Sequence, residues 1–574
     1  MTTYEHSQLV EAIRELGVVP SVPADFDEWL TANRHLQFLA RNSQASEQIL
    51  HGNGPFSYFE TVIVPATDLY PIDKADLLRW NCFPFQYIAG YGMSMAADDD
   101  LRVIPADHVS DSTTLRNAHR LVFHRYLEGV DDPSTRSFEL WQQFEHTLAV
   151  TWMPEYDAFC RINEHGDFES IVSTTQQDRV SLVTCNRSFL DEYLVATDCV
   201  LVVLFDFTMY RPNQFNGWPR DGEETVVTVD DDLFYRQRVI ESYGAYTRGV
   251  HVIQPRYTKR EAIASIRRRW SGRQDDDTGV EFTIIDWRHD QVREVSTERD
   301  ATTNYFDAVE GRPFELSPAF FRPEVLLKYT ADQDKYTVED RTIHCRGAWS
   351  MRSFGINDAG QVFAYVCYLR SLPIDEQRYW QSFNERPKAG LPEHVIETDF
   401  RGRWLEATPP QRLRNTLIRW ERGEVRWWRA GSEDITRGTV VPRSTSRDEW
   451  AATILRTAAL VIEGFQVRMV RQYLTEAGKT FEPEERSIVL LERACGVHRD
   501  SGGSGLTGLR EMQRIRNEGY VAHRSSDGGR GLAAEAIGKH GSYPKHFETL
   551  CDRVADDLTQ IEASLSEEEG TKGQ

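Results

Sequence analysis

Apolar and polar positions alternate in different ways along the chain. From about residue 56 to residue 206, short apolar runs such as YFETVIVPA and SLVTC lie between stretches with helical spacing. The run over residues 199–205 contains seven apolar residues, which suits a buried strand. A membrane-spanning helix needs about 20 such residues. The pattern therefore predicts a mixed α/β domain over residues 1–215.

Two further regions follow this domain. The stretches ETVVTVDDD, KREAIASIRRRW and GVEFTIIDW predict strands and one basic helix, and so a small α/β region over residues 216–312. Beyond it, apolar and polar residues alternate on both sides of NDAG, whose residues tolerate the backbone angles of a tight hairpin. We therefore expect a β-rich domain with a helix over residues 313–440.

The pattern becomes helical near residue 447. Apolar residues recur every three or four positions from Trp450 to Tyr473, which predicts one continuous helical face. Three more helices are predicted before residue 565, and a glycine-rich loop follows the third helix. The sequence thus predicts a four-helix bundle over residues 447–565 and a disordered tail over residues 566–574.

Composition limits the classes of function. The chain has 574 residues, is 40% hydrophobic and carries a formal net charge of -23, which suits a folded chain with several domains. Its beginning lacks the apolar core of a signal or anchor, so we expect a cytoplasmic protein with no membrane segment. Its eight cysteines show no CxxC spacing, and we expect no metal and no cofactor.

The most informative segment lies in the third predicted helix. Arg516 and His523 are seven residues apart, which places them within roughly 20° of each other on a helix. Leu509, Met512 and Tyr520 lie within roughly 40° of the same face, so the two polar residues interrupt an apolar stripe. The stripe could hold a core ion-pair network, an interface with another subunit, or a site built at such an interface.

A buried guanidinium needs a partner for its charge. The nearest acid of the same helix, Glu518, points roughly 160° away from the pair. The partner of Arg516 must therefore come from another helix, from another subunit, or from the phosphate of a ligand.

The segment RNEGYVAH, residues 516–523, resembles the motif of the HEPN nucleases and their inactive relatives. In that family a helical bundle carries an arginine, usually a polar residue after it, and then a histidine. The resemblance covers about 120 of the 574 residues. It implies metal-independent RNA cleavage by two motifs that meet across a homodimer. Many members of the family are thought to bind without cutting, so a non-catalytic dimerisation or nucleic-acid-binding role is the alternative.

The resemblance also implies roles for three residues. His523 would take the proton of a ribose 2′-hydroxyl or donate one to the leaving oxygen, because imidazole titrates near neutral pH. Arg516 would hold the phosphate and offset its charge in the transition state. Asn517 would orient the RNA or the histidine of the other subunit.

Local charge bears on RNA binding. Because the whole chain is acidic, a polyanion must meet a local basic surface. Residues 486–530 contain eight arginines and five acidic residues, a net charge of +3 in this segment. Arg514 and Arg524 are the candidate RNA contacts next to the motif.

A second arginine-rich stretch, EVRWWR, precedes the bundle. Arg426 and Arg429 could bind phosphates while a base stacks on Trp427, an arrangement typical of single-stranded RNA binding. The same alternation also fits a strand with one buried face and salt-bridged edges.

The remainder of the chain is expected to act as a sensor or regulator. The segment PAFFRPEVLLKYTADQDKYTVEDRTIHCRGAW is similar to a block found in uncharacterised prokaryotic proteins. The sequence lacks the G-x-S-x-G, H-E-x-x-H and Walker motifs, which leaves little support for a hydrolase, a zinc protease or an ATPase. We expect a mixed α/β (α+β) multi-domain part with an unknown trigger, followed by an all-α HEPN-like bundle, as in toxin or phage-defence systems.

Overall fold

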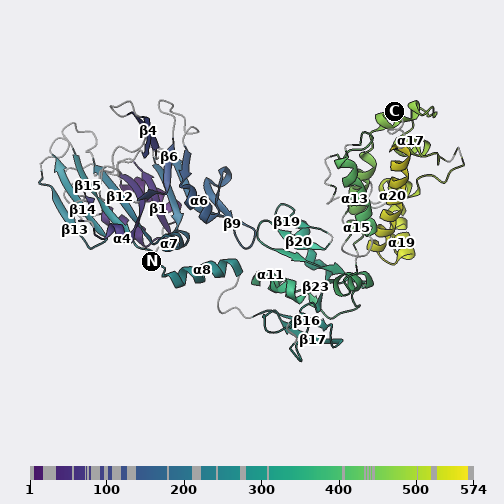
Figure 1. Cartoon of the computed structure of the whole chain (residues 1–574), viewed down its shortest axis with the longest axis horizontal. Helices are drawn as coiled ribbons and strands as arrows, with labels where there is room; N and C mark the ends of the chain where they lie inside the picture. The colour runs from purple at the N-terminus through teal and green to yellow at the C-terminus, as the bar shows by residue number, and fades with distance from the viewer. Residues whose placement is uncertain are drawn as a thin grey trace. The chain divides into compact units, whose positions relative to one another are not determined.

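The structure is a computed structural model of the chain. It describes residues 5–16, 34–54, 57–71, 73, 77–78, 91–95, 101–105, 118–125, 137–177, 180–209, 222–240, 244–271, 279–306, 309–339, 341–403, 407–423, 425–431, 435, 439, 441–442, 446–498, 500, 502–518 and 527–566. The fold is mixed α/β, with mostly antiparallel sheets in the N-terminal part and helices in the C-terminal part (Figure 1). The tail was predicted over residues 566–574; Ser566 is the last residue of a helix, and the rest of the tail lies outside the described residues.

The chain divides into two compact units. Unit 1 comprises residues 1–163 and 167–271, and unit 2 comprises residues 164–166 and 272–574. The predicted region over residues 216–312 is not a unit of its own, because its first strands extend the sheet of unit 1 and its last strands join a sheet of unit 2. The physical reason is strand pairing, since β15 pairs with β12 along its length.

Unit 1 is built on an antiparallel sheet of eleven described strands. Their order is β13-β14-β15-β12-β2-β1-β11-β10-β9-β8, and β5 pairs with β2. The strands of this sheet are β1 (Glu47–Asn53), β2 (Ser57–Pro65), β5 (His119–Arg120), β8 (Thr151–Met153), β9 (Ala158–Ile162), β10 (Phe168–Gln177), β11 (Val180–Asn186), β12 (Cys199–Met209), β13 (Thr225–Thr228), β14 (Leu233–Ile240) and β15 (Gly244–Ile253). Two separate hairpins are β3 (Tyr91–Met95) with β4 (Leu101–Pro105) and β6 (Val122–Arg125) with β7 (Ser137–Leu140).

The central strand β12 confirms the prediction of a buried strand at residues 199–205. Leu201, Val203 and Phe205 pack into the core on one face of the sheet, whereas Val200 and Val202 pack into the core on the other. This alternation follows from the two-residue period of a strand. The helices of unit 1 are α1 (His6–Leu16), α3 (Arg34–Ser43), α4 (Ala66–Leu69), α6 (Gln142–Leu148), α7 (Arg187–Thr197) and α8 (Lys259–Ser271).

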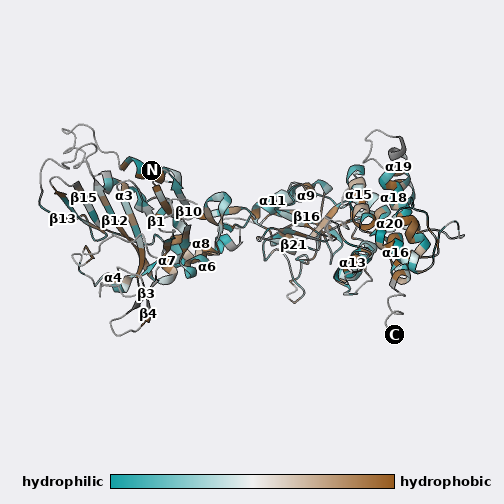
Figure 2. Ribbon diagram, turned by 90° about the horizontal axis from the view of Figure 1, so that it is seen from above, coloured by the Kyte–Doolittle hydropathy of each residue, from teal (hydrophilic) through white to brown (hydrophobic). Residues whose placement is uncertain are grey.

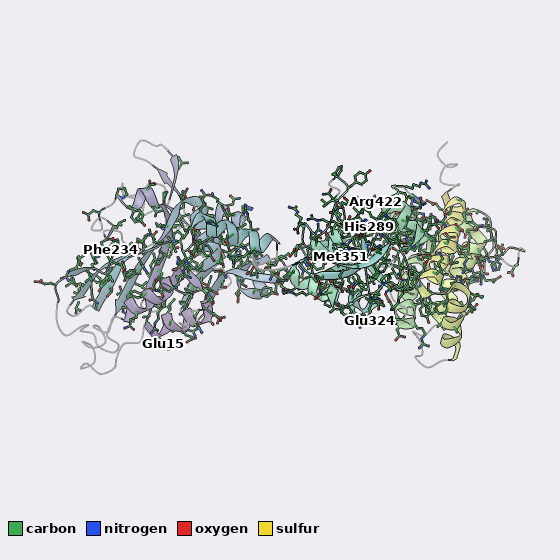
Figure 3. All side chains as sticks on the ribbon, turned by 90° about the horizontal axis from the view of Figure 1, so that it is seen from below. Glu15, Phe234, His289, Glu324, Met351 and Arg422 are labelled. Carbon is green, nitrogen blue, oxygen red and sulfur yellow. The ribbon has the colours of Figure 1, made fainter. Side chains whose placement is uncertain are left out.

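The first part of unit 2 is β-rich, and two sheets form it. One contains β16 (Glu281–Asp286), β17 (Gln291–Ser296), β18 (Pro318–Phe321), β22 (Gly355–Ile356), β23 (Val362–Tyr365) and β24 (Asn384–Glu385); the other contains β19 (Tyr336–Val338), β20 (Thr342–Cys345) and β21 (Ser350–Arg352). The NDAG hairpin is confirmed, because β22 pairs with β23 and Gly360 at the turn has a φ of 76°. Figure 3 labels Phe234 of β14 and Met351 of β21, which are buried in units 1 and 2 respectively.

Short helices complete the β-rich part. They are α9 (Leu327–Ala331), α10 (Val366–Arg370), α11 (Ile374–Gln381) and α12 (Glu393–Val395). Trp380 of α11 is fully buried against Phe321 of β18, with ring centroids 4.8 Å apart, so α11 packs on the sheet that contains β18.

We call residues 409–566 the helical region. It contains α13 (Pro409–Arg422), α15 (Arg447–Glu463), α16 (Val467–Glu476), α17 (Ser487–Ala494), α18 (Thr507–Glu518), α19 (Asp527–His540) and α20 (Tyr543–Ser566). One hydrophobic core joins all of them, and the apolar residues appear brown among the packed helices (Figure 2). The longest helix, α20, buries Phe547, Leu550, Val554 and Leu558 completely, as the helical spacing predicts.

The helical region departs from the predicted four-helix bundle in three places. The predicted helix from Trp450 to Tyr473 is two helices, α15 and α16. They separate where the Gly464 carbonyl accepts a hydrogen bond from the Arg429 N–H at 2.9 Å. The predicted glycine-rich loop contains α19, which forms because Leu532 and Ala536 are buried in the common core, and this packing outweighs the low helix propensity of glycine. The core also includes α13, so the region begins before the predicted boundary at residue 447.

In the described part of the chain, the structure contains no helix that is both long enough and apolar enough to cross a membrane.

Candidate functional site

Helix α18 carries the predicted motif, and two buried carboxylates fix its first turn. Glu492 of α17 is fully buried; it accepts a hydrogen bond from the Leu506 N–H at 3.0 Å and pairs with both ends of the Arg510 guanidinium. Asp557 of α20 accepts a hydrogen bond from the Leu509 N–H at 2.8 Å. The first N–H groups of a helix have no partner within the helix, and Asp557 satisfies that of Leu509. Glu492 binds the N–H of the residue before the helix, and both carboxylates complement the positive end of the helix dipole.

Burial has the largest effect on the pKa of Asp557. It raises the pKa of the carboxyl to about 6, although the N–H groups of Leu509 and Gly508 act in the opposite direction. The hydrogen bond to Glu492 raises the pKa of Arg510, so this guanidinium stays charged. The beginning of α18 is therefore held by the pair of Arg510 with Glu492 and by Asp557, a carboxylate that titrates in mildly acidic solution.

Helix α18 also approaches α20 closely at Gly508. A Cβ atom on Gly508 would lie 2.6 Å from the carbonyl carbon of Arg553 and 2.6 Å from the nitrogen of Val554. Side chains in ordinary contact stay beyond about 3.4 Å. Glycine is required here because the two backbones touch, and this contact sets the distance between the two helices.

Arg516 lies at the other end of α18, on the predicted apolar stripe. Leu509 and Met512 are fully buried, as the stripe requires. The Arg516 guanidinium pairs with Glu463, the last residue of α15; the arginine side chain is 29% exposed and the glutamate 56% exposed. The partner therefore comes from another helix of the same chain, one of the three sources that the sequence left open, and the pair lies at the surface.

The other motif residues are placed only in part. Asn517 is exposed and lies about 100° around α18 from Arg516. Helix α18 is described as far as Glu518. Gly519, Tyr520, His523 and Arg524 fall within residues 519–526, outside the described residues, so the predicted alignment of Arg516 with His523 stays a prediction.

A hollow opens on the other side of α18. It has a volume of about 580 Å³ and is lined by α18, α19 and α20. Four cations converge on it, namely Arg510, Arg514, Lys539 and Arg553. Arg514 and Arg516 are two residues apart and so point about 160° apart on the helix. The structure therefore separates Arg514, a predicted RNA contact, from the motif arginine.

Two carboxylates lie among the cations of the hollow. Glu535 is 2.6 Å from the Lys539 ammonium and 3.7 Å from the Arg514 guanidinium. The hydrogen bond from Lys539 lowers the pKa of Glu535, so it stays ionised. Glu511 pairs with Arg553. A third carboxylate, Glu492, pairs with Arg510 from behind the wall, so the four cations leave a formal excess of one positive charge.

A buried histidine supports one wall of the hollow. The Nδ1 atom of His546 accepts a hydrogen bond from Trp450 Nε1 at 3.1 Å, and burial lowers the pKa of this histidine to about 4. His546 is therefore neutral at physiological pH, and its ring supports that of His540, 5.1 Å away at the edge of the hollow.

The predicted stacking site at EVRWWR is wrong. Trp427 is buried, and its ring packs against Trp420 at 4.5 Å and against Phe465 at 6.3 Å. The alternative, a strand with one buried face, is also wrong, because residues 426–427 form a turn and Trp428 makes an isolated bridge with Phe465. Both tryptophans belong to the core, whereas Arg426 and Arg429 are exposed.

Sequence reasoning missed Lys539, His540 and Arg553 as a group, because it interpreted the segment around α19 as a loop. One feature of the sequence does indicate a helix there. Glu535 precedes Lys539 by four residues, and an acid placed four residues before a base stabilises an exposed helix.

We compared the chain with protein-family models, curated proteins and solved structures, and none of the three comparisons produced a match.

Proposed function

We propose that the chain is an RNA-cleaving effector whose helical region cuts RNA with Arg516, Asn517 and His523, while the rest of the chain detects a trigger and restrains it. This is the function implied by the resemblance of residues 516–523 to the HEPN motif. The observation that carries the proposal is the position of Arg516: an arginine at the surface end of an apolar stripe, held among the described residues by one exposed carboxylate, Glu463.

The ion pair of Arg516 suits a phosphate-binding role. Surface ion pairs contribute about 0–1 kcal/mol, because water screens both charges. A hydrogen bond to a charged group contributes about 1.5–3 kcal/mol, and arginine can bind phosphate through two parallel N–H groups. A phosphate of RNA can therefore replace Glu463 on the guanidinium.

The proposed chemistry uses two histidines. One His523 removes the proton of the ribose 2′-hydroxyl, and the 2′-oxygen then attacks the phosphorus. The bond from phosphorus to the 5′-oxygen breaks, and a second histidine, the partner subunit's His523, donates a proton to that oxygen. The products are a 2′,3′-cyclic phosphate and a 5′-hydroxyl. Arg516 stabilises the charge on the phosphate oxygens during the attack.

This chemistry motivates a homodimer through the helical region, because each chain supplies one His523. A prokaryotic toxin or phage-defence protein of this kind acts in the cytoplasm on cellular or invading RNA. The β-rich part and unit 1 would then hold the trigger site.

A test in cells uses three proteins: the wild type, His523→Ala and His344→Ala. His344 is exposed on β20 and serves as a matched histidine control. Each protein is expressed with and without phage infection, and growth and RNA integrity are recorded. We expect RNA loss and growth arrest with the wild type and with His344→Ala, and neither with His523→Ala. Equal behaviour of all three under every condition would contradict the proposal.

A non-catalytic nucleic-acid-binding or dimerisation module is the second candidate. One observation favours it, namely that Glu463 of the same chain already satisfies Arg516. If the pair serves only to join α15 and α18, a double-mutant cycle of Arg516→Ala and Glu463→Ala gives a coupling energy in unfolding, and RNA in the cell stays intact with every variant.

A further inference from the structure

The hollow on α18 holds charge that the proposed cleavage site does not use. It lies about 160° around the helix from Arg516, so a nucleotide bound at Arg516 does not reach it directly. Its cations come from three different helices. Glu492 ties α18 to α17, Asp557 and the close contact at Gly508 hold α18 and α20 together, and α19 packs into the same hydrophobic core. The hollow is therefore a built feature of the helical region.

We propose that this hollow binds a phosphomonoester dianion. Such a group carries a charge of about -1.5 to -2 at pH 7 and three strong acceptor oxygens. Arg514 and Lys539, the two cations that pair with Glu535, match this charge, while a phosphodiester of an RNA backbone carries only one negative charge. Arg514 supplies planar paired donors and Lys539 a compact charge, the two kinds of donor that proteins use for phosphate.

The proposed phosphate takes the place of the Glu535 carboxylate. This carboxylate lies between Lys539, at 2.6 Å, and Arg514, at 3.7 Å, and so occupies the place of an anion. The Glu535 side chain is 38% exposed, and those of Arg514 and Lys539 are 44% and 67% exposed. Water therefore screens these pairs, and a phosphate with more charge displaces the carboxylate. Arg510 stays bound to the buried Glu492 and forms a fixed wall of the hollow.

The volume of about 580 Å³ leaves room for the group that carries the phosphate. Two sources share this chemistry: the 5′-phosphate end of an RNA strand and a small phosphorylated molecule. The first deepens the proposed function and rests on it, since the cleavage described above produces 5′-hydroxyl ends. The protein would then hold RNA by its original 5′ end and release its own downstream product.

The test measures binding by the full chain at a fixed 150 mM salt, because phosphate binding depends on ionic strength. The His523→Ala variant is the background, so that cleavage does not consume the probe. The probes are one oligoribonucleotide with a 5′-phosphate, the same strand with a 5′-hydroxyl, and inorganic phosphate as competitor. We expect at least tenfold tighter binding of the 5′-phosphorylated strand and competition by phosphate.

Two lysines provide the variant and its control. Lys539 and Lys545 are both 67% exposed and both pair with a glutamate of their own helix, but only Lys539 lines the hollow. Lys539→Ala is expected to abolish the preference and Lys545→Ala to retain it, while Glu535→Gln strengthens phosphate binding.

The outcomes separate the two sources. If inorganic phosphate binds in a way that depends on Lys539, but the two strands bind equally well, the site is assigned to a small phosphorylated molecule. Absence of phosphate competition, or equal binding by Lys539→Ala and Lys545→Ala, overturns the proposal. RNA cleavage by the wild type is measured separately, so its failure affects the proposed function and leaves the binding result intact.

Discussion

Replacing Gly508 with alanine tests how the helical region positions α18. The added Cβ would lie 2.6 Å from two backbone atoms of α20, so the helices must separate by about 0.8 Å to restore ordinary contact. Overpacking of this kind costs about 1–3 kcal/mol. At 1.4 kcal/mol for each tenfold change, hydrogen exchange in α18 and α20 should accelerate by roughly 5- to 150-fold. The separation also moves Arg510 and Arg514 away from Arg553.

The matched control is Gly538→Ala in α19. No atom lies within 4 Å of the Cβ that would be added there. Alanine should therefore stabilise α19 by up to about 1 kcal/mol, through its higher helix propensity. Exchange is measured by mass spectrometry on peptides from each helix, which reports local stability in a chain with two units. If Gly508→Ala leaves exchange in α18 unchanged or slows it, the reasoning about the contact between α18 and α20 is wrong.

Three further predictions concern single residues of the helical region. Glu463→Gln should change the free energy of unfolding by no more than about 1 kcal/mol, because its pair with Arg516 is exposed. The same change should tighten RNA binding in a filter assay, and weaker binding would argue against a phosphate role for Arg516. Asp557 has its pKa raised from 3.8 to about 6, so the folded state binds a proton between these values that the unfolded state does not. As the pH falls from about 6 to about 4, the free energy of unfolding of the wild type should therefore rise by up to about 3 kcal/mol relative to that of Asp557→Asn. Urea denaturation measures both values, and a difference between the two proteins that stays constant across this pH range would contradict the assignment. Trp427→Ala should destabilise the helical region by about 3–5 kcal/mol, because the ring is buried, and RNA affinity of the folded variant should change less than twofold; a large loss of affinity without loss of stability would restore the stacking interpretation.

Much of the fold could be read from local patterns. The strand at residues 199–205, the NDAG hairpin and the buried face of α20 follow from periodicity and turn chemistry, which depend on neighbouring residues alone. Domain boundaries depend instead on long-range pairing. Nothing local indicates that β15 pairs with β12 in the sheet of unit 1 or that α13 packs into the helical core.

The candidate site was predicted only in part, because some of its contacts join residues that are distant in the sequence. The apolar stripe beside Arg516 was visible in the spacing, and the need for a partner from another helix, another subunit or a ligand followed from charge burial. The partner itself, Glu463, lies 53 residues away in sequence, and no spacing rule connects the two. The hollow was missed because its third wall is α19, a glycine-containing helix that tertiary packing stabilises.

The most direct test of the central claim is the chemistry of RNA ends produced by the purified protein. Full-length wild type, Arg516→Ala, His523→Ala and His344→Ala are incubated with RNA in the presence of a metal chelator, and the new termini are identified by mass spectrometry. The account predicts 2′,3′-cyclic phosphate and 5′-hydroxyl ends with the wild type and His344→Ala, and neither end with the two motif variants. Cleavage that persists in His523→Ala, or wild-type ends of another kind, would contradict it.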